Sequence, residues 1–101
     1  MNDCLFCKIA AGEIPSTKVY EDETTLAFRD INPQAPVHVL VIPKKHVSGW
    51  YDAQNESDAE LAHLMRVAAM VAKSENIVES GFRVVSNCGD DAQQTVKHRH
   101  L

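Results

Sequence analysis

Short runs of β-branched and apolar residues, separated by turn residues, predict five strands along this chain. They lie at 18–21, 24–29, 37–42, 82–86 and 95–101, and Gly, Pro, Asn and Asp residues mark the connections. Most consecutive strands are joined without a crossover helix, which predicts an antiparallel sheet. The run at 37–42 is nearly all apolar, so we expect it to be buried on both faces. The first segment, 4–11, is short and mixed, and no element is predicted there.

One longer stretch, about 57–73, has the period of an amphipathic helix. Ser57 and Glu60 have the spacing of a capping box, in which each side chain bonds the other residue's backbone N–H. Apolar residues then follow at steps of three and four: Leu61, Leu64, Met65, Ala68 and Ala72. About five strands with this one main helix predict an α+β fold. The apolar face suits packing on a sheet or on a second subunit.

Composition and charge limit the classes of function. The chain has 101 residues, 45% of them hydrophobic, and an even composition, so we expect one domain over 1–101. The net charge of −4 argues against nucleic-acid binding, which depends on a basic surface, but it leaves room for a mononucleotide pocket. There is no apolar run of about 20 residues and no secretory signal, and three cysteines are too few for a disulfide scaffold. We therefore expect a cytoplasmic protein that does not enter a membrane.

Two of the five histidines, His98 and His100, stand two positions apart in the last predicted strand. Side chains at this spacing face the same side of a strand. Imidazole can act there as a nucleophile, a proton carrier or a metal ligand, although a solvated pair at a strand end would have the same spacing. A third histidine, His38, lies within the apolar run at 37–42, so its side chain needs a polar partner.

Cys4 and Cys7 form a Cys-x-x-Cys pair near the start of the chain. A thioredoxin-type redox role would place this pair at a strand-to-helix junction in a parallel sheet, and no parallel sheet is predicted. Two thiolates together with two histidines could hold zinc. Two unpaired thiols that pack as small hydrophobic groups are the alternative.

Two polar loops place ligand-binding groups near these residues. Asp30 directly follows the strand at 24–29, where its carboxylate can accept hydrogen bonds from hydroxyls. Gln94, Thr95 and the local backbone N–H groups precede the histidine pair and could hold a phosphate oxygen. Ordinary turn chemistry would also place Asp and Asn in such loops.

Taken together, four segments resemble the histidine-triad superfamily, and most closely its nucleotide-binding branch, which is related to nucleoside phosphoramidate hydrolases. These segments are 4–9, 26–46, 82–87 and 94–101, and they occur in order and with normal spacing. The resemblance covers essentially the whole chain. It implies a histidine-triad fold, a purine nucleotide as ligand and a homodimer as the usual assembly.

The resemblance also implies a role for each histidine. Family members use the middle histidine of the triad as nucleophile, and that position here is His100. It would attack the α-phosphorus of a nucleoside 5′-phosphoramidate or a related ester, and water would then release the monophosphate from the nucleotidyl-histidine. His98 would have a structural role in orienting the site, and His38 would contact the pocket residues without touching the nucleotide itself.

By the same resemblance, the polar loops would surround the nucleotide. Asp30 would accept hydrogen bonds from the ribose hydroxyls, while Phe28 and Ile31 would help line the base pocket. Donors around the phosphate would stabilise charge as it builds. The contacts to the phosphate or the scissile bond would come from Asn87, Gln94 and Thr95.

Some bacterial relatives also hold zinc through a Cys-x-x-Cys pair, the histidine after Pro-Lys-x and the first triad histidine. The corresponding positions here are Cys4, Cys7, His46 and His98. Four protein ligands would make a closed structural site rather than a catalytic one. Such a site would fix the His98 ring from the side opposite the pocket.

Several positions depart from the family pattern. The sequence stops at Leu101, one residue before the third histidine, so either residues follow it or the protein is truncated and impaired. Arg99 and Lys97 stand where apolar or aromatic residues are usual, and the pair at 92–93 replaces two glycines of the phosphate loop. Two alternatives to the hydrolase therefore stay open. One is a nucleotide-binding or interaction module without catalysis, and the other is a small zinc-stabilised protein whose histidines serve only the metal.

Overall fold

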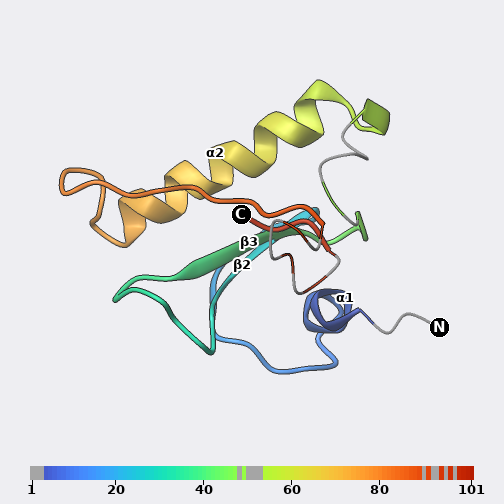
Figure 1. Ribbon diagram of the computed structural model, residues 1–101, viewed down its shortest axis with the longest axis horizontal. Coiled ribbons are helices and arrows are strands. Elements are labelled where there is room, and N and C mark those ends of the chain that lie inside the picture. Colours follow the sequence, from blue (N-terminus) through green and yellow to red (C-terminus); the bar gives the residue numbers. More distant parts are fainter. Residues whose placement is uncertain are drawn as a thin grey trace.

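A three-stranded antiparallel sheet lies between two helices in the computed structural model (Figure 1). The strands, in their order across the sheet, are β1 (Lys18–Glu21), β2 (Thr25–Arg29) and β3 (Val39–Pro43). The helices are α1 (Leu5–Ala10) and α2 (Asp58–Ser74). The structure describes residues 4–47, 49, 54–89, 91, 94, 96 and 98–101. Within this part, neither helix has the length and apolar character needed to cross a membrane.

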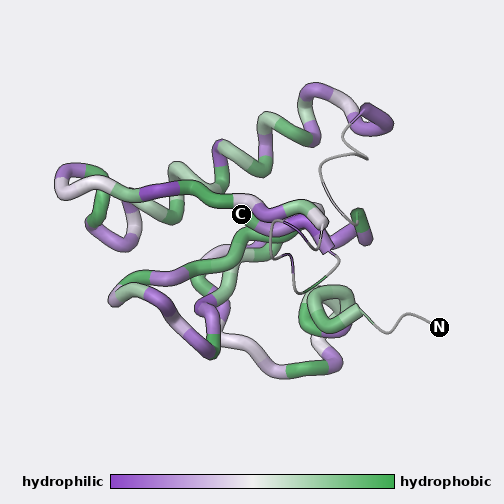
Figure 2. The backbone as a smooth tube through the Cα atoms, viewed as in Figure 1, coloured by the Kyte–Doolittle hydropathy of each residue, from purple (hydrophilic) through white to green (hydrophobic). Residues whose placement is uncertain are grey.

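Both faces of the sheet are covered, because neighbouring side chains on β2 and β3 enter two different hydrophobic clusters. The cluster toward α1 consists of Phe6, Ile9, Leu26, Phe28, Leu40 and Ile42. The cluster toward α2 consists of Ala27, Val41, Leu64, Val67, Ala68 and Val71. The alternation of hydrophobic and hydrophilic residues along α2 is visible in Figure 2. The third strand is therefore buried from both sides, as its apolar run predicts.

Helix α2 confirms the predicted helix to within one residue. The Glu60 N–H donates to Ser57 Oγ and the Ser57 N–H donates to Glu60 Oε1, both at 3.1 Å, which completes the capping box. The predicted apolar stripe is wrong at Met65, whose side chain is 47% exposed. The buried face adds Val67 to four residues that the sequence places in or beside the stripe: Leu64, Ala68, Val71 and Ala72.

The α+β class and the antiparallel pairing are confirmed, but only three strands are present in the described residues, where about five were predicted. The range 82–86 runs without strand pairing, and residues 95 and 97 of the last predicted strand lie outside the described part. Segment 4–11, for which no element was predicted, contains α1. Its six helical residues are too few to show a helical period in sequence.

The end of the chain adds one residue pair to the outer edge of β3 (Figure 1). Leu101 and Val41 exchange both backbone hydrogen bonds, at 3.0 and 3.3 Å. The same register would next pair Arg99 with Pro43, and proline has no N–H to donate. The Arg99 N–H donates instead to the Val47 carbonyl at 2.5 Å. The missing donor explains why pairing at this edge does not continue into a regular strand.

Candidate functional site

Four metal-binding side chains converge where α1, the end of β3 and the last residues of the chain meet. Their ligand atoms, from Cys4, Cys7, His46 and His98, all lie within 4.8 Å of one another. Cys4 immediately precedes α1 and Cys7 lies three residues later, so both thiols leave the same side of this helix. His98 Nδ1 is 3.3 Å from both sulfurs, and His46 Nδ1 is 3.2 Å from Cys7 Sγ. The structure thus brings together all four residues that the sequence predicts as metal ligands.

Hydrogen bonding and burial prepare His98 as a ligand. Its Nε2 lies 2.8 Å from the Pro43 carbonyl oxygen and donates to it, since that oxygen can only accept. The neutral ring therefore presents an unprotonated Nδ1 to the two sulfurs, as a metal-bound histidine does. The ring is fully buried, and this burial lowers the pKa of His98. The Pro43 carbonyl opposes the shift, and nearby imidazole and guanidinium groups strengthen it.

The donor set and its spacing fit a closed structural metal site. Zinc binds thiolate sulfur at about 2.3 Å and imidazole nitrogen at about 2.0 Å in a tetrahedron, which places its ligand atoms about 3.5 Å apart. The sulfur-to-nitrogen separations of 3.2 and 3.3 Å are close to this value. Because all four positions come from the protein, such a metal would have no open position for a reacting water.

In the His100 ring, the nitrogen that donates a hydrogen bond is the other one, Nδ1 instead of Nε2. Its Nδ1 lies 2.8 Å from the His98 carbonyl oxygen and donates to it, so the neutral ring keeps its lone pair on Nε2. The Phe6 ring packs edge-on against it, with centroids 5.0 Å apart and an interplanar angle of 90°. The residue is half-buried. A neutral, oriented imidazole with a lone pair on its outer nitrogen can act as a nucleophile.

Two further residues contribute to this site and received no role from the sequence. The Ser86 hydroxyl donates to the His100 carbonyl at 2.7 Å, which holds the backbone of the candidate nucleophile. Phe6 contacts both imidazoles, with ring centroids 5.9 Å from His98 and 5.0 Å from His100. Both residues lie in segments that carry the family resemblance, and this is the signal that could have found them.

The residues predicted to bind ribose and base lie at and just beyond the end of β2. Phe28 is buried and packs edge-on against Phe6 at 5.7 Å, so it supports the site from the core. Ile31 is 88% exposed. Asp30 Oδ2 lies 3.4 Å from His38 Nε2. His38 is only half-buried, which corrects its expected full burial, and it has the polar partner that the sequence called for.

The predicted phosphate loop is described in part. Thr95 lies outside the described residues, and Asn87 is half-buried at the start of the loop. Gln94 is buried and makes two hydrogen bonds with the backbone of Gly89. The Gln94 N–H donates to the Gly89 carbonyl at 3.0 Å, and Gln94 Oε1 accepts from the Gly89 N–H at 2.7 Å.

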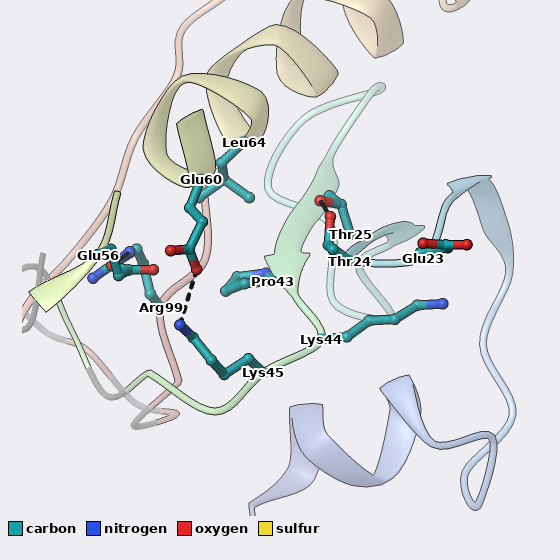
Figure 3. A pocket seen from close by; sticks show the side chains of 10 residues that line it. All are labelled: Glu23, Thr24, Thr25, Pro43, Lys44, Lys45, Glu56, Glu60, Leu64 and Arg99. Atoms are coloured by element: carbon teal, nitrogen blue, oxygen red, sulfur yellow. Dashed lines mark hydrogen bonds and ion pairs between the residues drawn. The ribbon is translucent and has the colours of Figure 1, made fainter. Parts of the chain in front are cut away.

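Arg99 lies between the two histidines and is a buried cation, with 1% of its surface exposed. Its guanidinium binds the Glu56 carboxylate and the Gly49 carbonyl, the latter at 2.7 Å. Arg99 also lines a pocket of about 240 Å³ between the start of α2 and the strand ends, which the Lys45–Glu60 ion pair borders (Figure 3). This pocket does not include any of the described residues that were predicted to bind the nucleotide.

The chain is similar to known proteins in both sequence and structure, and the matches agree with one another. Residues 11–101 match the HIT domain. A 14 kDa zinc-binding protein of Zea mays is 50% identical over 99 residues, covering 96% of this chain and 77% of that protein. A HIT family hydrolase from Legionella pneumophila has a similar structure, with a TM-score of 0.93 and 48% identity over 97% of this chain and 88% of that chain. A histidine triad nucleotide-binding protein from Candida albicans gives a TM-score of 0.88 and 38% identity over 97% and 71%.

Proposed function

The chain belongs to the HIT domain family, and we propose that it is a purine-nucleotide-binding hydrolase of the branch related to nucleoside phosphoramidate hydrolases. Its substrates would be nucleoside 5′-phosphoramidates or related nucleotidyl esters. The similar structures of a HIT family hydrolase and of a histidine triad nucleotide-binding protein support this class. The observation that carries the proposal is the bond from His100 Nδ1 to the His98 carbonyl, which leaves Nε2 unprotonated.

In the proposed reaction, His100 Nε2 attacks the α-phosphorus of the substrate. A bond forms between Nε2 and phosphorus, and the bond from phosphorus to the leaving nitrogen or oxygen breaks as the leaving group takes a proton from water. The ring then carries positive charge, which strengthens the hydrogen bond from Nδ1 to the His98 carbonyl. Water next attacks the phosphorus and releases its proton to solvent, while the bond from phosphorus to Nε2 breaks and its electron pair returns to the nitrogen. The nucleoside 5′-monophosphate leaves with His100 neutral again, so one difficult step is divided into two easier ones.

The nucleotide would lie across the loops that follow β2 and precede His100. Asp30 would accept hydrogen bonds from the ribose hydroxyls, and the exposed Ile31 side chain would cover one face of the base. Phe28 would support this surface through its packing on Phe6. The phosphate contacts would come from Asn87, Gln94 and Thr95.

The cluster of two cysteines and two histidines would hold zinc as a structural ion. The zinc-binding name of the Zea mays relative and the donor set at this site support this assignment. The ion would cross-link α1 to the residues that carry His98 and His100. Elemental analysis of protein supplied with zinc should find about one ion per chain, and replacement of the exposed Cys88 by Ser should not lower that content. Absence of zinc from the parent protein would exclude this role.

A homodimer is the assembly that we propose. Large apolar side chains are exposed on α2 and on the segment that follows it: Met65, Met70, Phe82, Val84 and Val85. Exposed apolar side chains of this size are typical of surfaces that associate. Analytical ultracentrifugation should give twice the chain mass, and a single chain mass at micromolar concentration would contradict the dimer.

Replacement of His100 by Ala tests the proposed function. We expect turnover of adenosine 5′-phosphoramidate to fall at least about a thousandfold, because the nucleophile is removed, while calorimetry still detects AMP binding. His63→Ala is the matched control, because His63 is also partly exposed and bonds a carboxylate elsewhere, that of Asp22. Hydrolysis at the parent rate by His100→Ala would show that His100 is not the nucleophile. A parent protein that binds AMP without hydrolysing the phosphoramidate would instead be a nucleotide-binding module.

A further inference from the structure

Arg99 is a buried cation that takes no part in the proposed reaction. Its side chain lines the pocket beside the start of α2, with Glu56 next to it (Figure 3). One terminal nitrogen of the guanidinium binds the Glu56 carboxylate, and the other donates to the Gly49 carbonyl at 2.7 Å. The planar guanidinium thus holds two points of the chain between β3 and α2 at the same time.

Gly49 lies between Arg99 and the predicted phosphate loop, which comprises residues 87–95. Gly49 is buried, and a Cβ atom at this position would lie 2.7 Å from Cys88 Sγ and 3.8 Å from Gln94 Oε1. The backbone of residue 49 therefore packs directly against the loop, and glycine permits this close approach. Gln94 is one of the residues proposed to contact the phosphate, so the contact reaches the binding groups themselves.

The bond from Arg99 restricts a part of the backbone that is intrinsically free to move. Gly49 lies outside the helices and strands, and glycine has the widest backbone freedom of all residues. A charged donor makes a stronger bond to a carbonyl than a neutral donor does. Because Glu56 holds the other nitrogen of the guanidinium, the Gly49 carbonyl is tied to a second point of the fold.

We propose that Arg99 is a positioning residue for the phosphate loop. Its guanidinium fixes the Gly49 carbonyl, and the backbone of Gly49 in turn sets the position of Cys88 and Gln94. This inference rests on the proposed function, in which Gln94 and its neighbours in the loop contact the phosphate. Without the bond from Arg99, residue 49 can move away from the loop. The loop then binds a phosphate less tightly, while the contacts to base and ribose remain.

A paired apolar replacement separates this role from a contribution to stability. Arg99→Met combined with Glu56→Leu removes both buried charges and fills a similar volume, so the unfolding midpoint in urea should stay near that of the parent. The double variant has no side-chain donor for the Gly49 carbonyl. Calorimetric titration should therefore show AMP binding that is about tenfold weaker, the size of one hydrogen bond to a charged group. Binding of adenosine, which lacks the phosphate, should be unchanged.

The matched control is the ion pair of Arg29 and Glu75, which also uses both terminal nitrogens of an arginine. Arg29→Met combined with Glu75→Leu should leave the ratio of AMP to adenosine affinity as it is in the parent. If the Arg99 and Glu56 double variant does not fold, Arg99→Lys replaces it in the comparison. A single ammonium keeps a cation opposite Glu56 but lacks the second arm of the guanidinium, so AMP binding should again weaken while adenosine binding is kept.

Parent-like AMP binding by the folded double variant would overturn the inference and leave the proposed function standing. Equal weakening of AMP and adenosine would do the same, because the effect would then not pass through the phosphate. A parent that binds AMP no more tightly than adenosine would overturn the phosphate contacts of the proposed function together with the role of Arg99.

Discussion

His98 and His100 stand two positions apart, yet the structure gives their rings opposite protonation patterns. His98 donates from Nε2 to the Pro43 carbonyl and turns Nδ1 toward two sulfurs. His100 donates from Nδ1 to the His98 carbonyl and keeps its lone pair on Nε2. In each case, one backbone carbonyl decides which nitrogen can bind a metal or attack an electrophile. The same side chain thus contributes to a candidate metal site at one position and is the proposed nucleophile at the other.

The two histidines also differ in burial. His98 is fully buried, and its ring packs against Phe6 and His46 with centroids 5.9 and 5.1 Å apart. His100 is half-buried, and Phe6 covers it edge-on. Packing at the first position contributes to stability, while the second position keeps the unprotonated nitrogen that the proposed reaction uses. Substitutions should therefore separate stability from activity.

The largest expected effect on stability comes from His98→Ala. This change leaves a cavity, removes the partner of the Pro43 carbonyl and deletes one proposed metal ligand, so the free energy of unfolding should fall by about 3–5 kcal/mol. His100→Ala should lower it by about 1 kcal/mol or less, because the ring is only half-buried. Urea unfolding and metal content measure the difference. Similar losses of stability and metal in both variants would contradict the difference in role between His98 and His100.

The next effect concerns the residue between the two histidines. Glu56→Gln removes the charge that neutralises the buried Arg99 guanidinium, and breaking such a pair costs about 3 kcal/mol or more. Because Arg99 holds the backbone that carries both histidines, metal content and turnover should fall together. Glu21→Gln, which affects two ion pairs near the surface, with Lys18 and Lys44, should change much less. An unaltered unfolding midpoint in Glu56→Gln would contradict this role.

The smallest expected effect is a pH dependence of stability. Burial keeps the pKa of His98 below its ordinary value of 6.5, so the unfolded chain binds a proton more readily than the folded chain. This contribution to stability is complete above that value and is lost as the pH falls toward the folded pKa. In metal-free protein, the urea midpoint should be lower at about pH 5.5 than at about pH 7.5. His98→Asn should show a weaker dependence, and an identical dependence in both proteins would exclude His98 as its source.

Local patterns in the sequence predict the elements that are stabilised locally. The strand at Lys18–Glu21 and the helix that Ser57 caps follow from alternation, period and capping spacing. In the described residues of the last predicted strand, pairing is limited to Leu101 for a reason outside the strand's own residues, because the neighbouring strand presents Pro43 where the ladder needs a donor. Helix α1 is too short to show a period, and its packing on the sheet stabilises it.

The candidate site depends more on contacts between distant residues. Spacing alone places the histidine pair on one side of the chain, and the family resemblance adds His46 and the two cysteines as ligands. Arg99 can be identified in sequence as an unusual residue, but its partner Glu56 is 43 positions away. No local pattern selects that carboxylate. The tautomers of the two histidines are equally inaccessible from sequence, because a carbonyl position in the folded backbone determines each of them.

The assignment of roles to the two imidazoles can be tested directly by proton–nitrogen NMR of metal-free protein at about pH 7.5, which lies above the ordinary pKa of imidazole. Chemical shifts of the ring nitrogens report which one carries the proton. We expect the Nδ1–H tautomer for His100 and the Nε2–H tautomer for His98. An Nε2–H tautomer at His100 would leave no lone pair directed at phosphorus and would contradict the proposed nucleophile.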